Sequence, residues 1–329
     1  MKQFWKDMGI AVILGLIVPA VLLSAAVSLL AQEREPAEDT QPDKETELAA
    51  ATEEYVPRMQ VSVLAEDGQV VQMALDEYLT CVLLCEMPVY FEEEALKAQS
   101  VVARTYIIRA ARGAAKHEQA AVCTRSNCCQ GFLAVEEYLA AGGQQEDVQH
   151  IRDLILETDG QVLTYEGNLI EATYFSCSGG STEDAVAVWG TDVPYLRSVA
   201  SPGEENAAHY TDTVTFSPAD FASKLGITLS GEASDWFGNV TYTAGGGVAA
   251  MEIGGQAFTG TELRKLLNLR STAFDMTAVD GTIMVVTRGF GHRVGMSQYG
   301  ADAMAKTGSN YKEILSYYYQ GTQLEQCTD

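Results

Sequence analysis

Basic residues are scarce in this chain: 21 lysines and arginines stand against 45 acidic residues, which gives a formal net charge of −24. Nucleic-acid phosphates would be repelled unless a local basic patch intervened, and the sequence has none. The composition therefore argues against a nucleic-acid-binding protein. With 329 residues, 47% hydrophobic and 20% charged, the chain is long enough for one large or two modest ordered domains.

Two common catalytic motifs are also absent, and there is no internal repeat. Ser176 is not surrounded by a Gly-x-Ser-x-Gly elbow, so the sequence does not support it as a nucleophile. The glycine-rich stretch 288–301 lacks Gly-Lys-Ser/Thr and is not a phosphate loop. His292 lies in that stretch, where it can either assist proton transfer or substrate binding, or orient the loop by hydrogen bonding.

Residues 8–31 form an uncharged stretch that is long enough to span a bilayer. Leu29-Leu30-Ala31 is a poor cleavage site, so we expect an uncleaved anchor rather than a signal peptide. Lys2 and Lys6 precede the apolar stretch and predict a cytoplasmic stub with the rest of the chain outside the cytoplasm. Residues 32–55 are acidic with two prolines, which is typical of a disordered tether.

The remaining residues, 56–329, combine helical and strand patterns without regular alternation, which predicts an α+β fold. Helices dominate the first part and strands the later part. A hairpin around Asp67-Gly68 opens the domain. The expected helices are 76–85, 92–112, 147–159, 262–269, 296–306 and 312–319, and the expected strands are 162–165, 169–175, 240–243, 251–253 and 282–287.

Glu86 is a candidate acid because Pro88 ends its helix and leaves it at the terminus. Lys97 and Arg104 are seven residues apart, about two helical turns, so both project from one face of the next helix. A desolvated glutamic acid beside a basic stripe can stay protonated and donate a proton. The same pattern is compatible with a simple ion pair at a helix end.

A loop brings together His117, Cys123, Cys128 and Cys129, a set of donors that suits Zn²⁺. The alternatives are a disulfide from Cys123 to Cys128 or Cys129, or unpaired core thiols. The total of seven cysteines leaves at least one thiol unpaired. We expect Cys81, Cys85 and Cys177 to be core residues, the first two on one helix face.

The segment 174–183 ends a strand in a small glycine-rich turn, and Trp189 and Tyr195 follow it. Hydroxyl groups, exposed N–H groups and aromatic faces are the parts of a sugar-binding groove. A tight turn that requires glycine explains the same residues equally well.

Several ordered blocks lie between residues 56 and 324: Glu77-Tyr78 with Glu86-Met87-Pro88, the run 95–106, Cys123 with Cys129-Gln130, Ser178-Gly179-Gly180, Trp189-Gly190, Pro194-Tyr195-Leu196, 269–272, and Gly291-His292 with 294–301. Together these blocks resemble the stage II sporulation protein D family of lytic transglycosylases. The single amino-terminal anchor is also similar to that family's.

The resemblance implies that the chain cleaves peptidoglycan glycan strands between N-acetylmuramic acid and N-acetylglucosamine during engulfment of the forespore. It implies action after an amidase has removed the stem peptides, together with two other engulfment membrane proteins. Glu86 matches the catalytic glutamate, and His117, Cys123 and Cys129 match positions that bind zinc in some members of the family, with Cys128 as a possible addition. We expect the groove to be supported by Lys97, Gln99, Arg104, Tyr174, Ser176, Ser178, His292 and Gln298.

Two positions depart from the family pattern. Cys128 stands where relatives often have histidine, which leaves the ligand set open. Arg293 replaces the middle glycine of Gly-His-Gly-Val-Gly; a bulky cation there can touch the substrate or narrow the groove, and it puts a glycine-specific backbone role in doubt.

The mechanism follows from having one prominent carboxyl group. A hydrolytic glycosidase normally needs two, whereas a lytic transglycosylase uses the muramic acid's own C6 hydroxyl and yields a 1,6-anhydro ring. We therefore expect Glu86 to act first as acid and then as base, with Lys97 and Arg104 at least one helical turn away and zinc as a structural ion. The rivals are a non-catalytic glycan-binding amidase enhancer and, more weakly, a zinc hydrolase.

Overall fold

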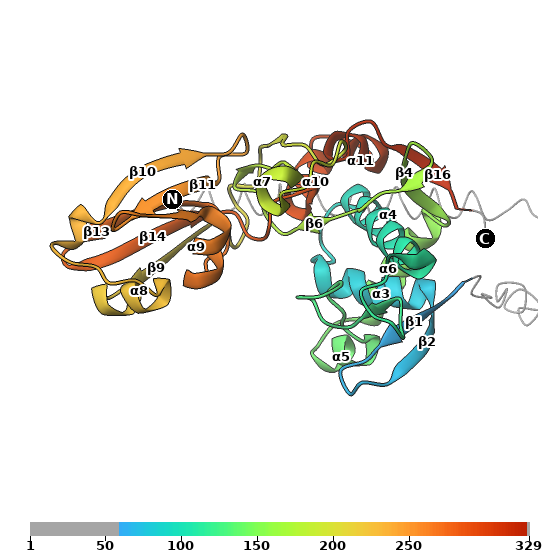
Figure 1. Cartoon of the computed structure of the whole chain (residues 1–329). Coiled ribbons are helices and arrows are strands. Elements are labelled where there is room, and N and C mark those ends of the chain that lie inside the picture. The colour runs from blue at the N-terminus through green and yellow to red at the C-terminus, as the bar shows by residue number, and fades with distance from the viewer. Residues whose placement is uncertain (1–58, 328–329) are drawn as a thin grey trace, which may run out of the picture. The chain divides into compact units, whose positions relative to one another are not determined.

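The computed structural model describes residues 59–327, and it has the α+β class that the sequence predicts (Figure 1). The expected anchor at 8–31 and tether at 32–55 lie outside the described residues. Within residues 59–327, no helix combines the length and the apolar character needed to cross a bilayer.

The first part of the domain is a hairpin followed by helices. Strand β1 (Gln60–Leu64) pairs antiparallel with β2 (Val70–Ala74), and Gly68 in their turn has φ +85°, the left-handed conformation that favours glycine. Strand β3 (Val122–Cys123) adds in parallel to β1 and delivers the first cysteine of the candidate metal loop. The helices are α3 (Leu75–Glu86), α4 (Glu93–Arg109), α5 (Val135–Ala140) and α6 (Gln145–Glu157).

Helix α4 is the centre of the larger hydrophobic core. Most of its side chains are buried, and it packs against α3, α6, α10 (Gln298–Lys306), α11 (Tyr311–Tyr318) and strand β4 (Gln161–Tyr165). It continues into a short π-helix, Ala110–Ala114, where Gly113 has φ +115° and ends the helical course as the sequence predicts.

Strand β4 lies between β5 (Asn168–Leu169) and β16 (Gln323–Gln326), so the C-terminal end of the described chain closes this sheet. The predicted single strand 169–175 is wrong. The segment is divided between two sheets. Its first residue belongs to β5, which pairs with β4, and its last two form β6 (Tyr174–Phe175), which pairs in parallel with β15 (Met296–Ser297). Two further short strands, β7 (Gly180–Ser181) and β8 (Ala200–Ser201), form a separate antiparallel pair, and α7 (Ala185–Trp189) lies between them in sequence.

A second, smaller hydrophobic core lies among the later strands and two helices, which are grouped together in Figure 1. One sheet has the order β10-β11-β12 and the other β13-β14-β9, all antiparallel. The elements are β9 (Thr211–Phe216), α8 (Pro218–Leu225), β10 (Phe237–Tyr242), β11 (Val248–Ile253), β12 (Gln256–Thr259), α9 (Gly260–Leu267), β13 (Ala273–Val279) and β14 (Thr282–Arg288).

Candidate active site and metal centre

Glu86 is the last residue of α3 and is half-buried. The helix buries Tyr78, Leu79, Val82 and Leu83 in the core. Met87 then adopts an extended conformation, because the following proline disfavours helix at the preceding residue. The core contacts of the helix therefore fix the backbone that carries the carboxylate.

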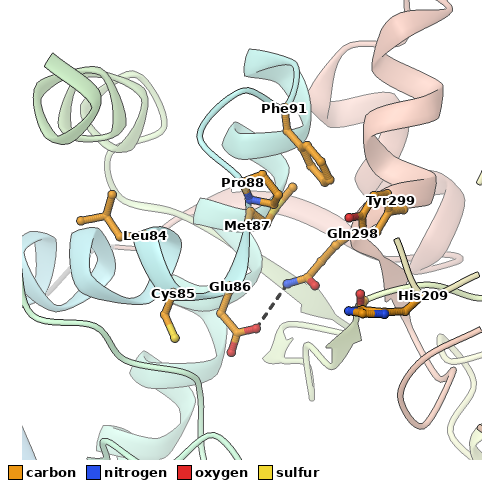
Figure 2. Close-up of a pocket in the computed structure, with 10 residues that line it drawn as sticks. Leu84, Cys85, Glu86, Met87, Pro88, Phe91, His209, Gln298 and Tyr299 are labelled. Atoms are coloured by element: carbon orange, nitrogen blue, oxygen red, sulfur yellow. Dashed lines mark hydrogen bonds between the residues drawn. The ribbon is translucent and has the colours of Figure 1, made fainter. Parts of the chain in front are cut away.

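Three hydrogen-bond donors from distant parts of the chain hold the Glu86 carboxylate. Its Oε1 accepts from the backbone N–H of Gly131 at 2.5 Å and from the hydroxyl of Tyr174 at 3.1 Å. Its Oε2 accepts a single, longer bond of 3.4 Å from the amide of Gln298, at the start of α10 (Figure 2). The two oxygens are thus unequal. Oε1 accepts two hydrogen bonds from the protein, whereas Oε2 accepts one and is more available to a ligand.

Tyr174 is a dependable donor. Burial, followed by the neighbouring Glu86 carboxylate, holds the pKa of Tyr174 well above its ordinary value. Its hydroxyl therefore stays protonated. The Gln130 amide in turn donates to the Tyr174 oxygen at 3.4 Å, which links this contact to the cysteine loop.

Two cavities meet at Glu86. Their volumes are about 440 Å³ and about 930 Å³, and both are lined by Glu86, Ser176 and Gln298. Figure 2 shows the smaller one, where Phe91, Tyr299 and His209 accompany the carboxylate. An elongated ligand lying through both cavities would pass over the carboxylate.

The sequence-predicted groove residues divide into two sets. Tyr174, Ser176, His292 and Gln298 line the larger cavity with Glu86. The other four predicted groove residues line neither cavity: Lys97, Gln99, Arg104 and Ser178. The structure therefore does not bring these four side chains into the two cavities around Glu86.

Arg104 is buried with 1% of its surface exposed and belongs to the core. Its guanidinium donates to the backbone carbonyls of Ile155 at 3.0 Å and Thr158 at 2.8 Å, where α6 ends. A cation is favourable at a helix C-terminus because unpaired carbonyls gather there. Arg104 therefore does not form the exposed basic stripe expected on α4, because the face of α4 that carries this residue packs against α6.

Lys97 pairs with Glu94 at 3.0 Å and with Glu157 at 2.7 Å. These carboxylates satisfy its charge away from the cavities. Ser178 is buried and donates to Glu204 at 2.9 Å, holding the glycine turn rather than a ligand. Gln99 is fully buried, and neither of its amide atoms has a hydrogen-bond partner in the described structure.

His292 acts on its own loop. Its Nδ1 accepts from the backbone N–H of Val294 at 3.1 Å, which places the proton of the neutral ring on Nε2. Burial, followed by the nearby Arg264 guanidinium, lowers the pKa of His292 to about 4, although a hydrogen bond with the Tyr174 backbone opposes the shift. A neutral imidazole packed against Phe175 and Trp189 fits the orienting role better than that of an acid.

Arg293 lines neither of these two cavities. It is 1% exposed, and its guanidinium donates to Glu183 at 3.2 Å and to the carbonyls of Ser178, Ser181 and Gly245 at 2.6–2.7 Å. Its φ is +66°, so the backbone keeps a glycine-type conformation even though the residue is arginine. The guanidinium contacts hold that conformation.

His117, Cys123, Cys128 and Cys129 place one donor atom each within 4.8 Å of one another. The His117 Nε2 lies 3.6 Å from the Cys128 sulfur and 3.5 Å from the Cys129 sulfur. An ideal tetrahedral zinc site separates nitrogen and sulfur ligands by about 3.6 Å, given its bond lengths. The four residues could therefore hold a metal ion, and this brings Cys128 into the set.

Cys123, Cys128 and Cys129 are free thiols in the structure, so the alternative of a disulfide in the loop is not observed. Cys81 and Cys177 are buried, as expected of core thiols. Cys85 is exposed and lines the smaller cavity beside Glu86, which corrects its assignment to the core. It lies in the last turn of α3, where core contacts end.

Sequence reasoning missed several residues that line the larger cavity with Glu86, because they come from separate elements and form no local motif. They are Tyr106, Lys116, Glu171, Arg264 and Phe290. Glu171 is the only acidic residue besides Glu86 that lines either of these two cavities.

Comparison with known proteins agrees with the blocks described above. A family model described as Stage II sporulation protein matches residues 65–165. The chain is 36% identical over 337 residues to Stage II sporulation protein D of Bacillus subtilis (strain 168), which covers 99% of this chain and 96% of that protein. It is 37% identical over 322 residues to the protein of the same name in Bacillus amyloliquefaciens, covering 95% and 93%. It is also 28% identical over 292 residues to the Amidase enhancer of Bacillus subtilis (strain 168), covering 73% of this chain and 39% of that protein.

Proposed function

The chain belongs to the stage II sporulation protein D family, and from this premise we propose that it is a peptidoglycan lytic transglycosylase of sporulation. It would cleave the bond between N-acetylmuramic acid and N-acetylglucosamine in stem-peptide-free glycan strands during engulfment. The observation that carries the proposal is the position of Glu86: an oriented carboxyl group where two ligand-sized cavities meet.

The inequality of the two carboxyl oxygens suits acid and then base catalysis. With Oε1 accepting from Gly131 and Tyr174, the proton is carried on Oε2. Oε2 gives it to the glycosidic oxygen as the bond from that oxygen to C1 of muramic acid breaks. The C6 hydroxyl of the same sugar then attacks C1, and the Glu86 carboxylate takes the hydroxyl proton. A C1–O6 bond replaces the broken one, and Glu86 is again protonated without consuming water.

The donors around Glu86 have separate tasks in this scheme. Gly131 and Tyr174 fix the plane of the carboxyl group, so that Oε2 faces the bound strand. The Gln298 amide, 3.4 Å from Oε2, supports the carboxylate after the proton has left. Hydrolysis would need a second carboxyl group, and among the cavity-lining residues only Glu171 can supply it.

A second candidate function follows from the similarity to the Amidase enhancer. In that reading, the cavities bind glycan and the protein activates a separate amidase without cutting the strand. Glu86 separates the two proposals, because a binding protein has no need for a carboxyl group held by three donors.

We further propose that residues 8–31 anchor the protein in the mother cell's engulfing membrane, with the catalytic domain outside the cytoplasm. Its partners would be the glycan strand, an amidase that first removes stem peptides, and other engulfment membrane proteins.

The metal would be Zn²⁺ held by His117, Cys123, Cys128 and Cys129, where it would cross-link the loop that carries these residues.

The test uses the full chain purified in detergent and incubated with peptide-free glycan strands, with products identified by mass spectrometry. We expect 1,6-anhydro-muramic ends from the wild type and from Glu171→Gln, and none from Glu86→Gln. If the wild type releases no such ends, the transglycosylase proposal is wrong. Products with reducing ends that depend on Glu171 would show hydrolysis, and anhydro products from Glu86→Gln would remove the role assigned to Glu86.

A further inference from the structure

Arg264 differs from three other arginines that are buried or half-buried in the described domain. Arg104 and Arg293 have carbonyl or carboxylate partners, and Arg270 pairs with Asp212 at 3.1 Å. Among residues 59–327, no carboxylate lies within ion-pair distance of the Arg264 guanidinium, and no hydrogen bond of its side chain is found. Its Nε is buried and has no partner.

This unsatisfied guanidinium lines the larger cavity together with Glu86. It projects from the middle of α9 and lies near His292. Burial alone lowers the pKa of Arg264, with no neighbouring carboxylate to oppose the shift, and the group stays charged at neutral pH. A buried donor without a partner is destabilising, because it has lost its hydrogen bonds to water. A ligand that supplies an acceptor would remove that cost.

The charge of the ligand is the next constraint. A chain of net charge −24 repels polyanions at long range, so an anionic strand needs a local cation at the site. Lys116 also lines this cavity, but its ammonium already donates to the Cys128 carbonyl. Arg264 is the cavity's remaining cation, and its planar fork matches a carboxylate.

We propose that Arg264 binds the lactyl carboxylate of N-acetylmuramic acid and thereby selects strands from which the stem peptide has been removed. This inference rests on the proposed function, since it takes the glycan strand as the occupant of the cavity. In a peptide-free strand the lactyl group is the only ionised group of each disaccharide. When a peptide is attached, that carboxylate is an amide and has no charge for Arg264 to bind. Selection would then follow from charge as well as from size.

The test compares two glycan oligomers that differ only at the lactyl group: the free carboxylate and its methylamide, which is small and neutral. For the full-length wild type we expect kcat/KM to be at least about tenfold higher for the carboxylate, since a hydrogen bond to a charged group contributes about 1.5–3 kcal/mol. Arg264→Gln should bring the ratio close to one by lowering activity on the carboxylate alone. Arg264→Lys should retain part of the preference.

Lys265→Gln is the matched control, because it removes the same charge from the next position of α9, where the side chain is exposed and outside both cavities. It should leave the ratio unchanged. The proposal is overturned if the wild type treats both oligomers alike, or if Arg264→Gln lowers both activities equally.

A binding measurement keeps this proposal separate from the catalytic one. Both oligomers are titrated calorimetrically into the Glu86→Gln variant, which should bind the carboxylate oligomer more tightly. The double variant Glu86→Gln/Arg264→Gln should bind the two oligomers equally. This preference is measured without any cleavage. If the wild type cleaves nothing but the binding preference depends on Arg264, the transglycosylase proposal is wrong and the carboxylate site stands. If the wild type cleaves the strand but shows no preference, the carboxylate site is wrong and the transglycosylase proposal stands.

Discussion

The backbone N–H of Gly131 lies 2.5 Å from Oε1 of Glu86 and joins the end of the cysteine loop to the end of α3. Cys128 and Cys129 are only three and two residues before this donor. The loop that could hold a metal therefore also sets the position of the candidate acid.

Gly131→Ala should lower kcat about 10- to 100-fold, because small displacements of a catalytic group are costly. A Cβ at this position would lie 2.7 Å from Glu86 Oε1 and 2.9 Å from the Cys85 sulfur, so the carboxyl group must move. Steady-state cleavage of peptide-free glycan measures the effect. The control is Cys85→Ala/Gly131→Ala, which relieves only the sulfur contact and should stay equally slow. Full recovery in this double variant would show that Glu86 is not the displaced group.

Removal of the metal should destabilise the domain. We expect the purified protein to carry about one zinc per chain, and a chelator to lower its Tm, because a ligand that binds only the folded state stabilises it. Cys128→Ser should lose most of the zinc, as measured by elemental analysis. Cys85→Ser, which alters a thiol outside the cluster, should keep it. Equal zinc in both variants would exclude Cys128 as a ligand.

Arg293→Gly should lower the free energy of unfolding by about 2–4 kcal/mol, although glycine suits the φ of +66°. The substitution leaves Glu183, 1% exposed, without its cation, and breaking a buried ion pair from one side costs about 3–5 kcal/mol. Urea unfolding measures the loss. Adding Glu183→Gln to Arg293→Gly should restore part of the stability, since it removes the unpaired charge. A loss below about 1 kcal/mol for Arg293→Gly would contradict this account.

His292 should make stability depend on pH in a defined window. Its pKa is about 4 in the folded protein and about 6.5 when unfolded, so the unfolded chain binds more protons between these values. The contribution of the neutral ring is complete above pH about 6.5 and is lost as the pH falls to about 4. His292→Asn retains an acceptor for the Val294 N–H and does not titrate. The stability advantage of wild type over this variant should therefore shrink by about 2 kcal/mol from pH 7 to 4, as measured by urea unfolding. A constant difference would contradict the pKa.

The sequence was sufficient to place Glu86 at the end of its helix and to predict helices in the earlier part and strands in the later part, because Pro88 and the glycines leave local signals. It was insufficient for Lys97 and Arg104. Seven-residue spacing predicts a shared helix face, but it does not say whether that face meets a groove or, as for Arg104, the carbonyls at the end of α6.

Arg264 was beyond prediction for a different reason. A single arginine on a short amphipathic helix is ordinary, and its lack of a partner emerges only when distant elements are placed around it. His117, Cys123, Cys128 and Cys129 lie in one loop, so their clustering was visible from the sequence.

The three donors to Glu86 are 45, 88 and 212 residues away from it along the chain. Contacts of such separation close long loops, which costs conformational entropy. The most distant donor, Gln298, is in the last tenth of the polypeptide. In a chain that is still being synthesised or translocated, Glu86 therefore lacks the Gln298 donor. Wall cleavage would begin only after synthesis is complete. Activity in a chain truncated after Ser297 would contradict this order of assembly.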